Sequence, residues 1–218
     1  MAEGRVSRAW AALAFDHVLL AVRDFGETVA RLRAAHGLAA LEGGRHTGWG
    51  TANWIVPLGD SYIELVSVVD PGAAATNDFG RRAQRAIAEG GGLFAWCVTT
   101  RDFDATVSRL GLDVAPGSRR RPDGAIVSWR AAGLAPALAD PSRPFFLAWE
   151  IPAELHPGRA SADHEVRPHG IAWVEVAGDE KSVRDWLGDD KLPVRVRPGA
   201  PALRAVGIAT DEGEVVLR

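Results

Sequence analysis

Apolar runs along this chain alternate with amphipathic stretches in an order that repeats. The run FDHVLLAV, which begins at Phe15, has the length and content of a buried strand. It is followed by RDFGETVARL, in which Val29 and Leu32 fall on one face of a helix. Three short β-like runs come next, LAALEGG, GTANWIVPL and SYIELVSV. The pattern predicts a β-α-β-β-β module over residues 15–70.

The same pattern recurs further along the chain, which indicates an internal duplication. The segment RDFDATVSRL, from Arg101 to Leu110, matches the first helical segment at seven of ten positions. The apolar run LFAWCV precedes it, and LDVAP, AIVSWRAAG and PFFLAWEI follow it, so a second module is predicted over residues 93–152. A third, more divergent copy, with the strand GIAWVEVA and the helix DEKSVRDWL, is predicted over residues 169–218.

The remaining segments connect these modules. We expect an N-terminal extension over residues 1–14, a linking helix over 71–92 and a loop over 153–168. A module with one helix leaves the other face of its sheet bare, and a second copy or a ligand must cover that face. The predicted fold class is therefore α+β, with repeated β-α-β-β-β modules that curl into a cup.

Composition bounds the classes of function. With 218 residues, 47% hydrophobic and 24% charged, the chain is expected to be a globular protein. Its net charge of -3 gives no attraction to nucleic acid or to an acidic membrane, and no apolar run approaches the ~18 residues of a membrane span. The apolar stretch near the N-terminus is too short for a signal peptide, so we expect a cytoplasmic location. The single cysteine, Cys97, excludes an internal disulfide framework, and the run Arg119–Arg121 is expected to be a solvated loop.

Strand alternation places a set of polar side chains on the cup face of the first module. If His17 faces the cup, the same rule selects Tyr62 and Glu64 on the last strand. On the strand before it, Thr51 and Asn53 share one face, and the polar pair belongs with the cup. Glu64 is the strongest signal, because it interrupts an apolar strand and a buried carboxylate needs a metal, a cation or a proton.

The same register, carried into the second module, predicts a different cup face. Ala95 and Ala148 take the positions of the histidine and the glutamate. Ser128 corresponds to the asparagine, and the tryptophan between Ser128 and Arg130 is expected to pack on the helix side. Arg130 and Glu150 also face the cup. A buried charge is costly without a partner, so these two either pair with each other or the arginine binds an oxyanion of a ligand.

With the strands DHVLLAV and YIELVSV and the internal repeat, the chain resembles the vicinal oxygen chelate superfamily, and within it the glyoxalase-like members. The resemblance covers the first two modules and implies that they curl into a cup. It also implies a divalent metal ion, held by a histidine on the first strand and a glutamate on the last, which match His17 and Glu64. A third ligand would come from His46, His156 or His169.

Two functions are consistent with these candidates. The first is an enzyme acting on a small oxygenated molecule, with a divalent ion at His17 and Glu64 and with Glu64 also serving as the catalytic base. Related families carry out isomerisation, epimerisation, carbon-sulfur lysis or ring cleavage. The second is a metal-free protein that binds or sequesters a small molecule, which the alanines of the second module favour.

A small-molecule ligand is the expected partner in both cases, and a homodimer is a further expectation. The predicted ligand-binding residues are Thr51, Asn53, Tyr62, Ser128, Arg130 and Glu150.

Overall fold

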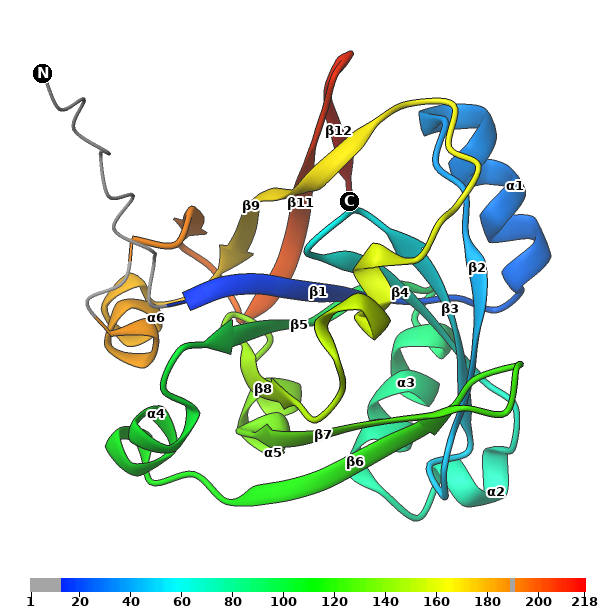
Figure 1. Cartoon of the computed structure of the whole chain (residues 1–218). Coiled ribbons are helices and arrows are strands. Elements are labelled where there is room, and N and C mark those ends of the chain that lie inside the picture. Colours follow the sequence, from blue (N-terminus) through cyan, green and yellow to red (C-terminus); the bar gives the residue numbers. More distant parts are fainter. Residues whose placement is uncertain (1–12, 189–190) are drawn as a thin grey trace, which may run out of the picture.

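The computed structural model describes residues 13–188 and 191–218, so the expected N-terminal extension lies almost wholly outside the described residues. Within them, eight strands form a closed barrel (Figure 1). The strands are β1 (Leu13–Ala21), β2 (Leu41–His46), β3 (Thr51–Pro57), β4 (Tyr62–Val68), β5 (Gly92–Thr100), β6 (Val114–Arg120), β7 (Ile126–Ala132) and β8 (Phe145–Trp149). Their order around the barrel is β1-β4-β3-β2-β6-β7-β8-β5, so each module supplies one half. The predicted fold of repeated modules that form a cup is confirmed.

Each half carries one helix at the place where the repeated motif predicts it. These helices are α1 (Phe25–His36) and α4 (Phe103–Leu110). The aspartate of the repeated Arg-Asp-Phe sequence caps each helix, because the side chains of Asp24 and Asp102 accept a hydrogen bond from the backbone amide three residues later. Both helices end at a glycine in the left-handed conformation, Gly37 and Gly111. The seven shared positions therefore encode a helix start as well as an apolar face.

Three more helices lie between the strands. They are α2 (Pro71–Ala74) and α3 (Asp78–Ala88), which join the two halves, and α5 (Leu134–Ala139), between β7 and β8. The linking helix predicted over 71–92 corresponds to α2 and α3. Phe79 and Ala83 of α3 belong to the same apolar cluster as Leu19 of β1 and Phe94 of β5. The linker thus packs against the interior of the barrel.

The C-terminal part forms a separate four-stranded sheet. It contains β9 (Pro168–Ala177), α6 (Glu180–Leu187), β10 (Val194–Arg197), β11 (Ala202–Thr210) and β12 (Gly213–Leu217). This is the order of elements expected for a third module. The strand order, however, is β10-β9-β11-β12, with β9 parallel to β10, whereas in the first module β1 runs parallel to β4, the last strand. The C-terminal unit repeats the order of elements but not the pairing of the strands.

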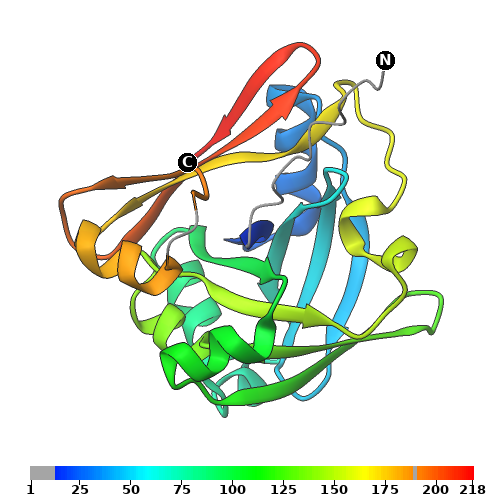
Figure 2. The ribbon, with the colours of Figure 1, turned by 60° about the vertical axis from the view of Figure 1, so that its left-hand side comes forward.

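This sheet covers the outside of the barrel, as Figure 2 shows. Val206 and Ile208 of β11 and Val174 of β9 lie in one apolar cluster with Val18 of β1 and Trp96 of β5. The chain between β8 and β9 contains two short 3-10 turns, η1 (Ala153–Leu155) and η2 (Pro157–Arg159). The apolar contacts between the sheet and the barrel therefore join the C-terminal unit to the first two modules.

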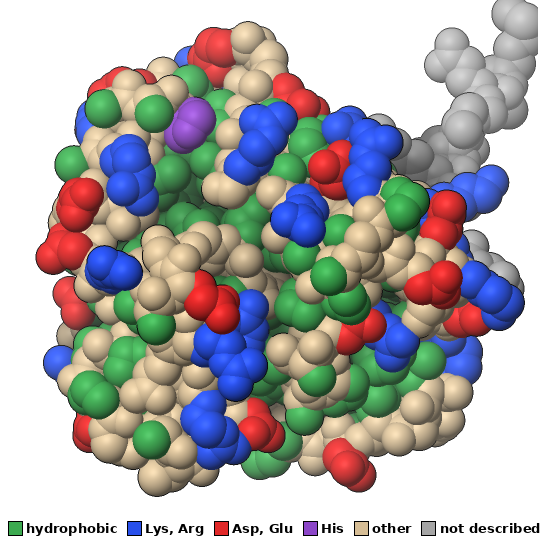
Figure 3. All heavy atoms as spheres, turned by 180° about the vertical axis from the view of Figure 1, so that it is seen from behind, with side chains coloured by type: hydrophobic (Ala, Val, Ile, Leu, Met, Phe, Trp, Pro, Cys, Tyr) green, Lys and Arg blue, Asp and Glu red, His purple; other side chains and the backbone are tan. Residues whose placement is uncertain are grey.

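The surface agrees with the small net charge. On the face seen in Figure 3, basic and acidic side chains are interspersed. Within the described part of the chain, no helix is both long enough and apolar enough to cross a membrane.

The contact between α2 and α3 gives a first prediction. A Cβ on Gly80 would lie 2.3 Å from the carbonyl oxygen of Ala74. Alanine is favoured over glycine inside a helix by ~1 kcal/mol. We nevertheless expect Gly80→Ala to lower the free energy of unfolding by about 1–3 kcal/mol, because two backbone segments must separate.

Urea denaturation measures this effect, and Gly72→Ala is its control. The new Cβ of Gly72→Ala would meet the Asp70 carboxylate at an ordinary 3.4 Å, so its free energy of unfolding should stay within about 0.5 kcal/mol of the wild type. Equal stability of the two variants would contradict the close packing of α2 and α3.

Candidate functional site

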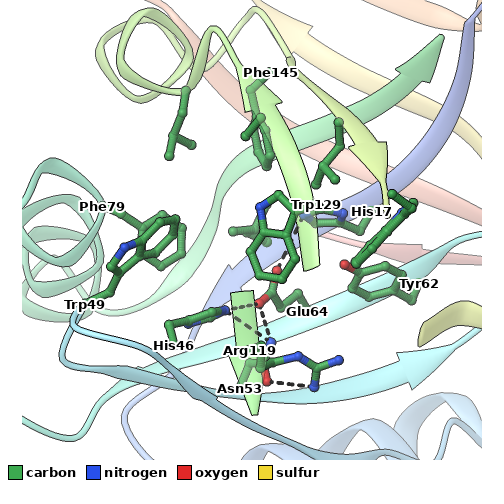
Figure 4. Close-up of a pocket in the computed structure, with 15 residues that line it drawn as sticks. His17, His46, Trp49, Asn53, Tyr62, Glu64, Phe79, Arg119, Trp129 and Phe145 are labelled. Carbon is green, nitrogen blue, oxygen red and sulfur yellow. Dashed lines mark hydrogen bonds and ion pairs between the residues drawn. The ribbon is translucent and has the colours of Figure 1, made fainter. Parts of the chain in front are cut away.

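A small pocket lies inside the barrel and is lined by both modules (Figure 4). We call it the central pocket. The first module contributes mainly polar side chains, and the second contributes mainly apolar ones. The polar set is His17, His46, Asn53, Tyr62 and Glu64, joined by Arg119 of β6; the apolar set includes Trp129, Ala131, Phe145, Leu147 and Trp149. The two halves of the duplicated fold have therefore taken different parts in the site.

Glu64 lies at the centre of the polar wall and is almost fully buried. His46 Nε2 is 3.2 Å from Oε1 of this carboxylate, and His17 Nε2 is 3.5 Å from Oε2. The amide of Asn53 also donates a short hydrogen bond to Oε1. Burial alone would raise the pKa of Glu64, but the hydrogen bond and charge of His46, the charge of His17 and the Asn53 hydrogen bond lower the pKa to about 2. Glu64 is therefore a carboxylate at neutral pH.

The His17 imidazole is oriented from behind by Asp16, which sequence reasoning missed. His17 Nδ1 lies 2.5 Å from Asp16 Oδ1. The other Asp16 oxygen accepts a hydrogen bond from Trp149 Nε1 at 2.8 Å and lies 3.2 Å from His156 Nε2. Burial raises the pKa of Asp16, but the hydrogen bonds of His156 and His17 outweigh burial and hold this pKa well below its usual range. An ionised Asp16 keeps the proton of His17 on Nδ1, so that Nε2 faces Glu64.

A bulge in β1 explains why two consecutive residues are buried together. The pairing of β1 with β5 shifts register between Phe15 and His17. The side chains of Asp16 and His17 contact each other, whereas neighbours on a regular strand point to opposite faces. Nothing in the letters FDHV marks this bulge.

His46 is held in a similar way. Its Nδ1 lies 2.8 Å from the Thr51 hydroxyl, so its Nε2 is directed toward Glu64. The structure thus brings Thr51 into the site as a partner of His46, and Thr51 does not line the central pocket. Asn53 does line it, between Glu64 and Arg119.

Tyr62 completes the polar wall. Its ring stacks on that of His17, with 4.6 Å between the ring centroids. Burial first, and then the charges of Glu64 and Asp16, raise the pKa of Tyr62 well above its usual value. The hydroxyl therefore keeps its proton and can donate a hydrogen bond.

Three predicted ligand-binding residues of the second module do not reach the pocket. On β7, Trp129 and Ala131 line it, which reverses the predicted faces and turns Ser128 and Arg130 away. Arg130 instead contacts Asp104 at 3.0 Å and Glu150 at 3.7 Å on the outside. From the sequence, Arg130 and Glu150 are expected either to pair with each other or to leave Arg130 free to bind an oxyanion of a ligand. The structure shows the pair.

The register of β8 explains the same error for the glutamate position. Leu19 of β1 pairs with Glu64, and Cys97 of β5 pairs with Phe145. If Ala95 is the counterpart of His17, then Phe145 is the counterpart of Glu64, and not Ala148. The predicted counterpart, Ala148, lies three residues after the actual one, Phe145. Because three is an odd number and side chains alternate along a strand, the residues predicted to face the cup lie on the opposite face.

The three candidates for a third metal ligand lie at different distances from the central pocket. His46 faces Glu64 inside the central pocket. His156 reaches the site only through Asp16. His169 lies apart in β9, with more than half of its side chain exposed, and pairs with Asp211. Only His46 is placed beside the two ligands that the sequence predicts.

The comparisons with known proteins agree with this architecture. A family model described as a glyoxalase-like domain matches residues 15–192. The chain belongs to this family. The glyoxalase-like assignment confirms the resemblance to the vicinal oxygen chelate superfamily. A search of curated proteins gave no match.

Solved structures share the fold at low sequence identity. A hypothetical protein from Staphylococcus aureus is 18% identical, with 90% of each chain covered and a TM-score of 0.68. Methylmalonyl-CoA epimerase from Mycobacterium tuberculosis is 15% identical, covers 66% of this chain and 92% of its own, and has a TM-score of 0.45. The epimerase from Streptomyces coelicolor, in complex with 2-nitronate-propionyl-CoA, is 18% identical over 62% and 94% of the chains, with a TM-score of 0.41. The similarity to the Staphylococcus aureus protein concerns the fold alone.

Membership of the glyoxalase-like family raises the question of whether the residues fit a divalent ion. In the described part of the chain, only Asp16, His17 and Cys97 bring three ligand atoms within 4.8 Å of one another. This group does not fit an ion, because both Asp16 oxygens already have hydrogen-bonding partners. Burial also raises the pKa of Cys97 well above its usual value, so its sulfur is a thiol.

The donor set of His17, His46 and Glu64 has ligand types that suit a divalent ion, but in this structure no choice of one ligand atom from each brings all three within 4.8 Å of one another. Two imidazole Nε2 atoms and one carboxylate face each other, and each imidazole is oriented through its Nδ1, as is usual for metal-bound histidines. Ligand atoms around one ion with bonds near 2.1 Å lie about 3.0–3.4 Å apart. The separations of 3.2 and 3.5 Å from the carboxylate are near this spacing, but the two imidazoles approach different oxygens, so His17 and His46 must move closer together to hold one ion.

The ionised state of Glu64 gives a second prediction, for protein freed of metal ions with a chelator. The pKa of Glu64 is about 2 in the folded protein against an ordinary 4.5, so its ionisation stabilises the fold above pH 4.5. This contribution, on the order of 3 kcal/mol, is lost as the pH falls from 4.5 to 2.

Comparing the wild type with Glu64→Gln isolates the contribution of Glu64 ionisation to the free energy of unfolding. We expect the free energies of unfolding of these two proteins, measured by chemical denaturation, to converge as the pH falls through this range. In Glu42→Gln, which changes an exposed carboxyl, the difference from the wild type should stay nearly constant. Parallel curves for Glu64→Gln and the wild type would show that the carboxylate is not held in its ionised form.

Proposed function

We propose that this protein is a glyoxalase-like enzyme that binds a small oxygenated molecule in the central pocket and uses a divalent metal ion. The observation that carries the proposal is the arrangement around Glu64. Two imidazoles direct Nε2 at one buried carboxylate, and a separate residue orients each of them. A fold needs no such arrangement for stability, since an apolar side chain would fill the same space at lower cost.

His17, His46 and Glu64 are the residues that would hold the ion. A divalent ion bound there would polarise a carbonyl oxygen of the ligand and stabilise an enolate. The low pKa of Glu64 favours a role as a charged ligand over the role of general base, because an efficient base has a pKa near the working pH. His46 is thus our choice among the three candidates for the third ligand.

Other side chains of the central pocket position the ligand and exclude water. The Tyr62 hydroxyl is protonated and lies in the pocket wall, where it can donate to a ligand oxygen. Trp129, Phe145 and Trp149 form an apolar wall opposite the polar groups. Low polarity on one side strengthens every electrostatic interaction made on the other. Asp16 and Thr51 are positioning residues, because they act only through His17 and His46.

A second candidate function is metal-free binding of a small molecule. It is favoured by the second module, where Ala95 and Phe145 occupy the positions that match His17 and Glu64. The carboxylate of Glu64 also already accepts a hydrogen bond from Asn53, without any ion. In this alternative, the same pocket binds the ligand through its hydrogen-bonding groups and no turnover follows.

Metal uptake distinguishes the two functions and is our third prediction. We expect the protein to bind one Co²⁺ ion with a visible absorption spectrum, measured by titration after treatment with a chelator. His17→Ala and His46→Ala should each weaken binding at least about tenfold, because each removes one of three protein ligands. His169→Ala, at the exposed histidine of β9, is the matched control and should bind like the wild type.

The opposite results are equally informative. No uptake of Co²⁺, Zn²⁺ or Mn²⁺ by the wild type would favour the metal-free alternative. Uptake that survives loss of His17 but is lost in His169→Ala would place the ion elsewhere. Circular dichroism spectra of the variants show whether each has kept its fold.

A further inference from the structure

Arg119 is the one member of the run Arg119–Arg121 that enters the barrel. Its side chain lines the central pocket, and the residue is only 5% exposed. The neighbouring Arg120 is exposed and bonds the Gly124 carbonyl oxygen. Arg119 pairs with His46 where β6 meets β2, so the seam between the two modules fixes its position. The expectation that the whole run is a solvated loop is therefore wrong for Arg119.

The guanidinium of Arg119 has few partners for a buried cation. It donates one hydrogen bond, from Nη1 to the Asn53 side-chain oxygen at 3.3 Å. Of the carboxylates in the described residues, none lies within 4.0 Å of it. The charge of Glu64 acts on the guanidinium from across Asn53, but no carboxylate bonds it directly, and a guanidinium offers five donors. Most of its capacity to bind an anion is unused.

Asn53 keeps the guanidinium and the carboxylate apart. Its amide nitrogen donates to Glu64, while its oxygen accepts from Arg119 (Figure 4). Gly43 makes room for this arrangement, because a Cβ there would lie 2.2 Å from the Asn53 oxygen and 2.5 Å from Arg119 Nη1. The chain thus holds a positive and a negative group in one pocket without letting them neutralise each other.

The size of the central pocket limits what lies next to Arg119. Its room for water-sized groups is about 40 Å³, and one water needs about 10–15 Å³ by the same measure. Only the head group of a ligand fits there. A larger hollow of about 410 Å³, which we call the side pocket, adjoins it. The two share five lining residues: Trp49, Phe79, Trp129, Ala131 and Leu134.

The charged residues that line the side pocket and the other neighbouring hollow indicate which end of a ligand would lie at Arg119. The only charged side chains in the lining of the side pocket, as described, are Asp78 and Asp113, so an anionic group is disfavoured there. The hollow on the other side of Arg119 is lined by three carboxylates, of Glu42, Asp123 and Glu154, and by one further cation, Arg121, which is paired with Asp123. The central pocket also contains one carboxylate, Glu64, but His17, His46 and Asn53 already surround it. An anionic head is therefore best placed at Arg119 inside the barrel, with an apolar body toward the aromatic rings.

We propose that Arg119 binds the carboxylate of a ligand whose apolar body occupies the side pocket between Trp49 and Trp129. The proposal rests on the proposed function, because it takes the central pocket as the ligand site. It adds the class of ligand, a carboxylic acid with an apolar body. The ligand carboxylate supplies the direct charge partner that Arg119 lacks and accepts two hydrogen bonds from the planar guanidinium.

Three probes test the two halves of this ligand by isothermal titration calorimetry, and this is our fourth prediction. They are 3-phenylpropanoate, its neutral amide 3-phenylpropanamide, and propanoate, which lacks the ring. We expect the wild type to bind 3-phenylpropanoate at least about tenfold more tightly than either of the others. Arg119→Gln should weaken binding of 3-phenylpropanoate at least about tenfold and leave binding of the amide unchanged.

Arg120→Gln is the matched control, since it removes the adjacent outward-facing arginine, and it should bind like the wild type. Arg119→Lys keeps the positive charge but loses the planar guanidinium, so its affinity for 3-phenylpropanoate should lie between those of the wild type and Arg119→Gln. Equal affinity of the wild type for the acid and the amide would overturn the proposal without any variant. So would equal loss of acid binding in Arg120→Gln. Co²⁺ uptake is measured without carboxylates, so failure here with intact uptake would leave the proposed function standing.

Discussion

The carboxylate of Glu64 lies inside an apolar barrel, and the polar half of the structure depends on keeping it ionised. An isolated charge at such a place costs several kcal/mol, and Glu64 tolerates burial because His46, His17 and Asn53 surround it. Each of these partners needs a partner in turn. Thr51 supports His46, Asp16 supports His17, and Arg119 supports Asn53. One buried charge therefore accounts for a network that extends from β1 to β6.

That network also explains local features that look unrelated. The bulge in β1 exists where Asp16 and His17 must both be buried, and Gly43 stands where any side chain would displace Asn53 and Arg119. The loop after β8 is tied to the same network through His156, which contacts Asp16. Substitution of one member leaves the others buried without a partner, so their energetic effects should not be additive.

Duplication produced two halves with different chemistry. The first module kept a polar cup face around Glu64, while the second presents Phe145 and aromatic rings at matching positions. A symmetric cup with four ligands would surround a metal ion from both sides. Here a polar wall faces an apolar wall. The asymmetry favours a ligand that is itself polar at one end and apolar at the other.

Much of this was readable in the sequence, and the errors have specific causes. The repeated Arg-Asp-Phe segment indicates both modules, and Glu64 in an apolar strand indicates the polar wall, because a buried carboxylate needs a metal, a cation or a proton beside it. In the second module, by contrast, β8 reads FFLAW, with no polar residue to set its faces, so the predicted register is wrong and places Glu150 inward. On β7, the rule that polar residues face the cup places Ser128 and Arg130 inward, whereas Trp129 and Ala131 line the pocket. Asp16 was missed because a bulge breaks alternation, and Arg119 because a run of three arginines is typical of a solvated segment.

The C-terminal sheet shows the limit of such inference most clearly. Its order of elements repeats that of a module, yet β9 is flanked by β10 and β11, so both of its edges are used and β12 cannot pair with it. Order along the chain does not determine pairing in space. In the described structure, every residue that lines the central pocket lies between His17 and Trp149, and the sheet instead covers the outside of β1 and β5 through Val206 and Ile208. Its effect on the site is therefore indirect: it stabilises the strand that carries Asp16 and His17, and it leaves ligand choice to the two modules of the barrel.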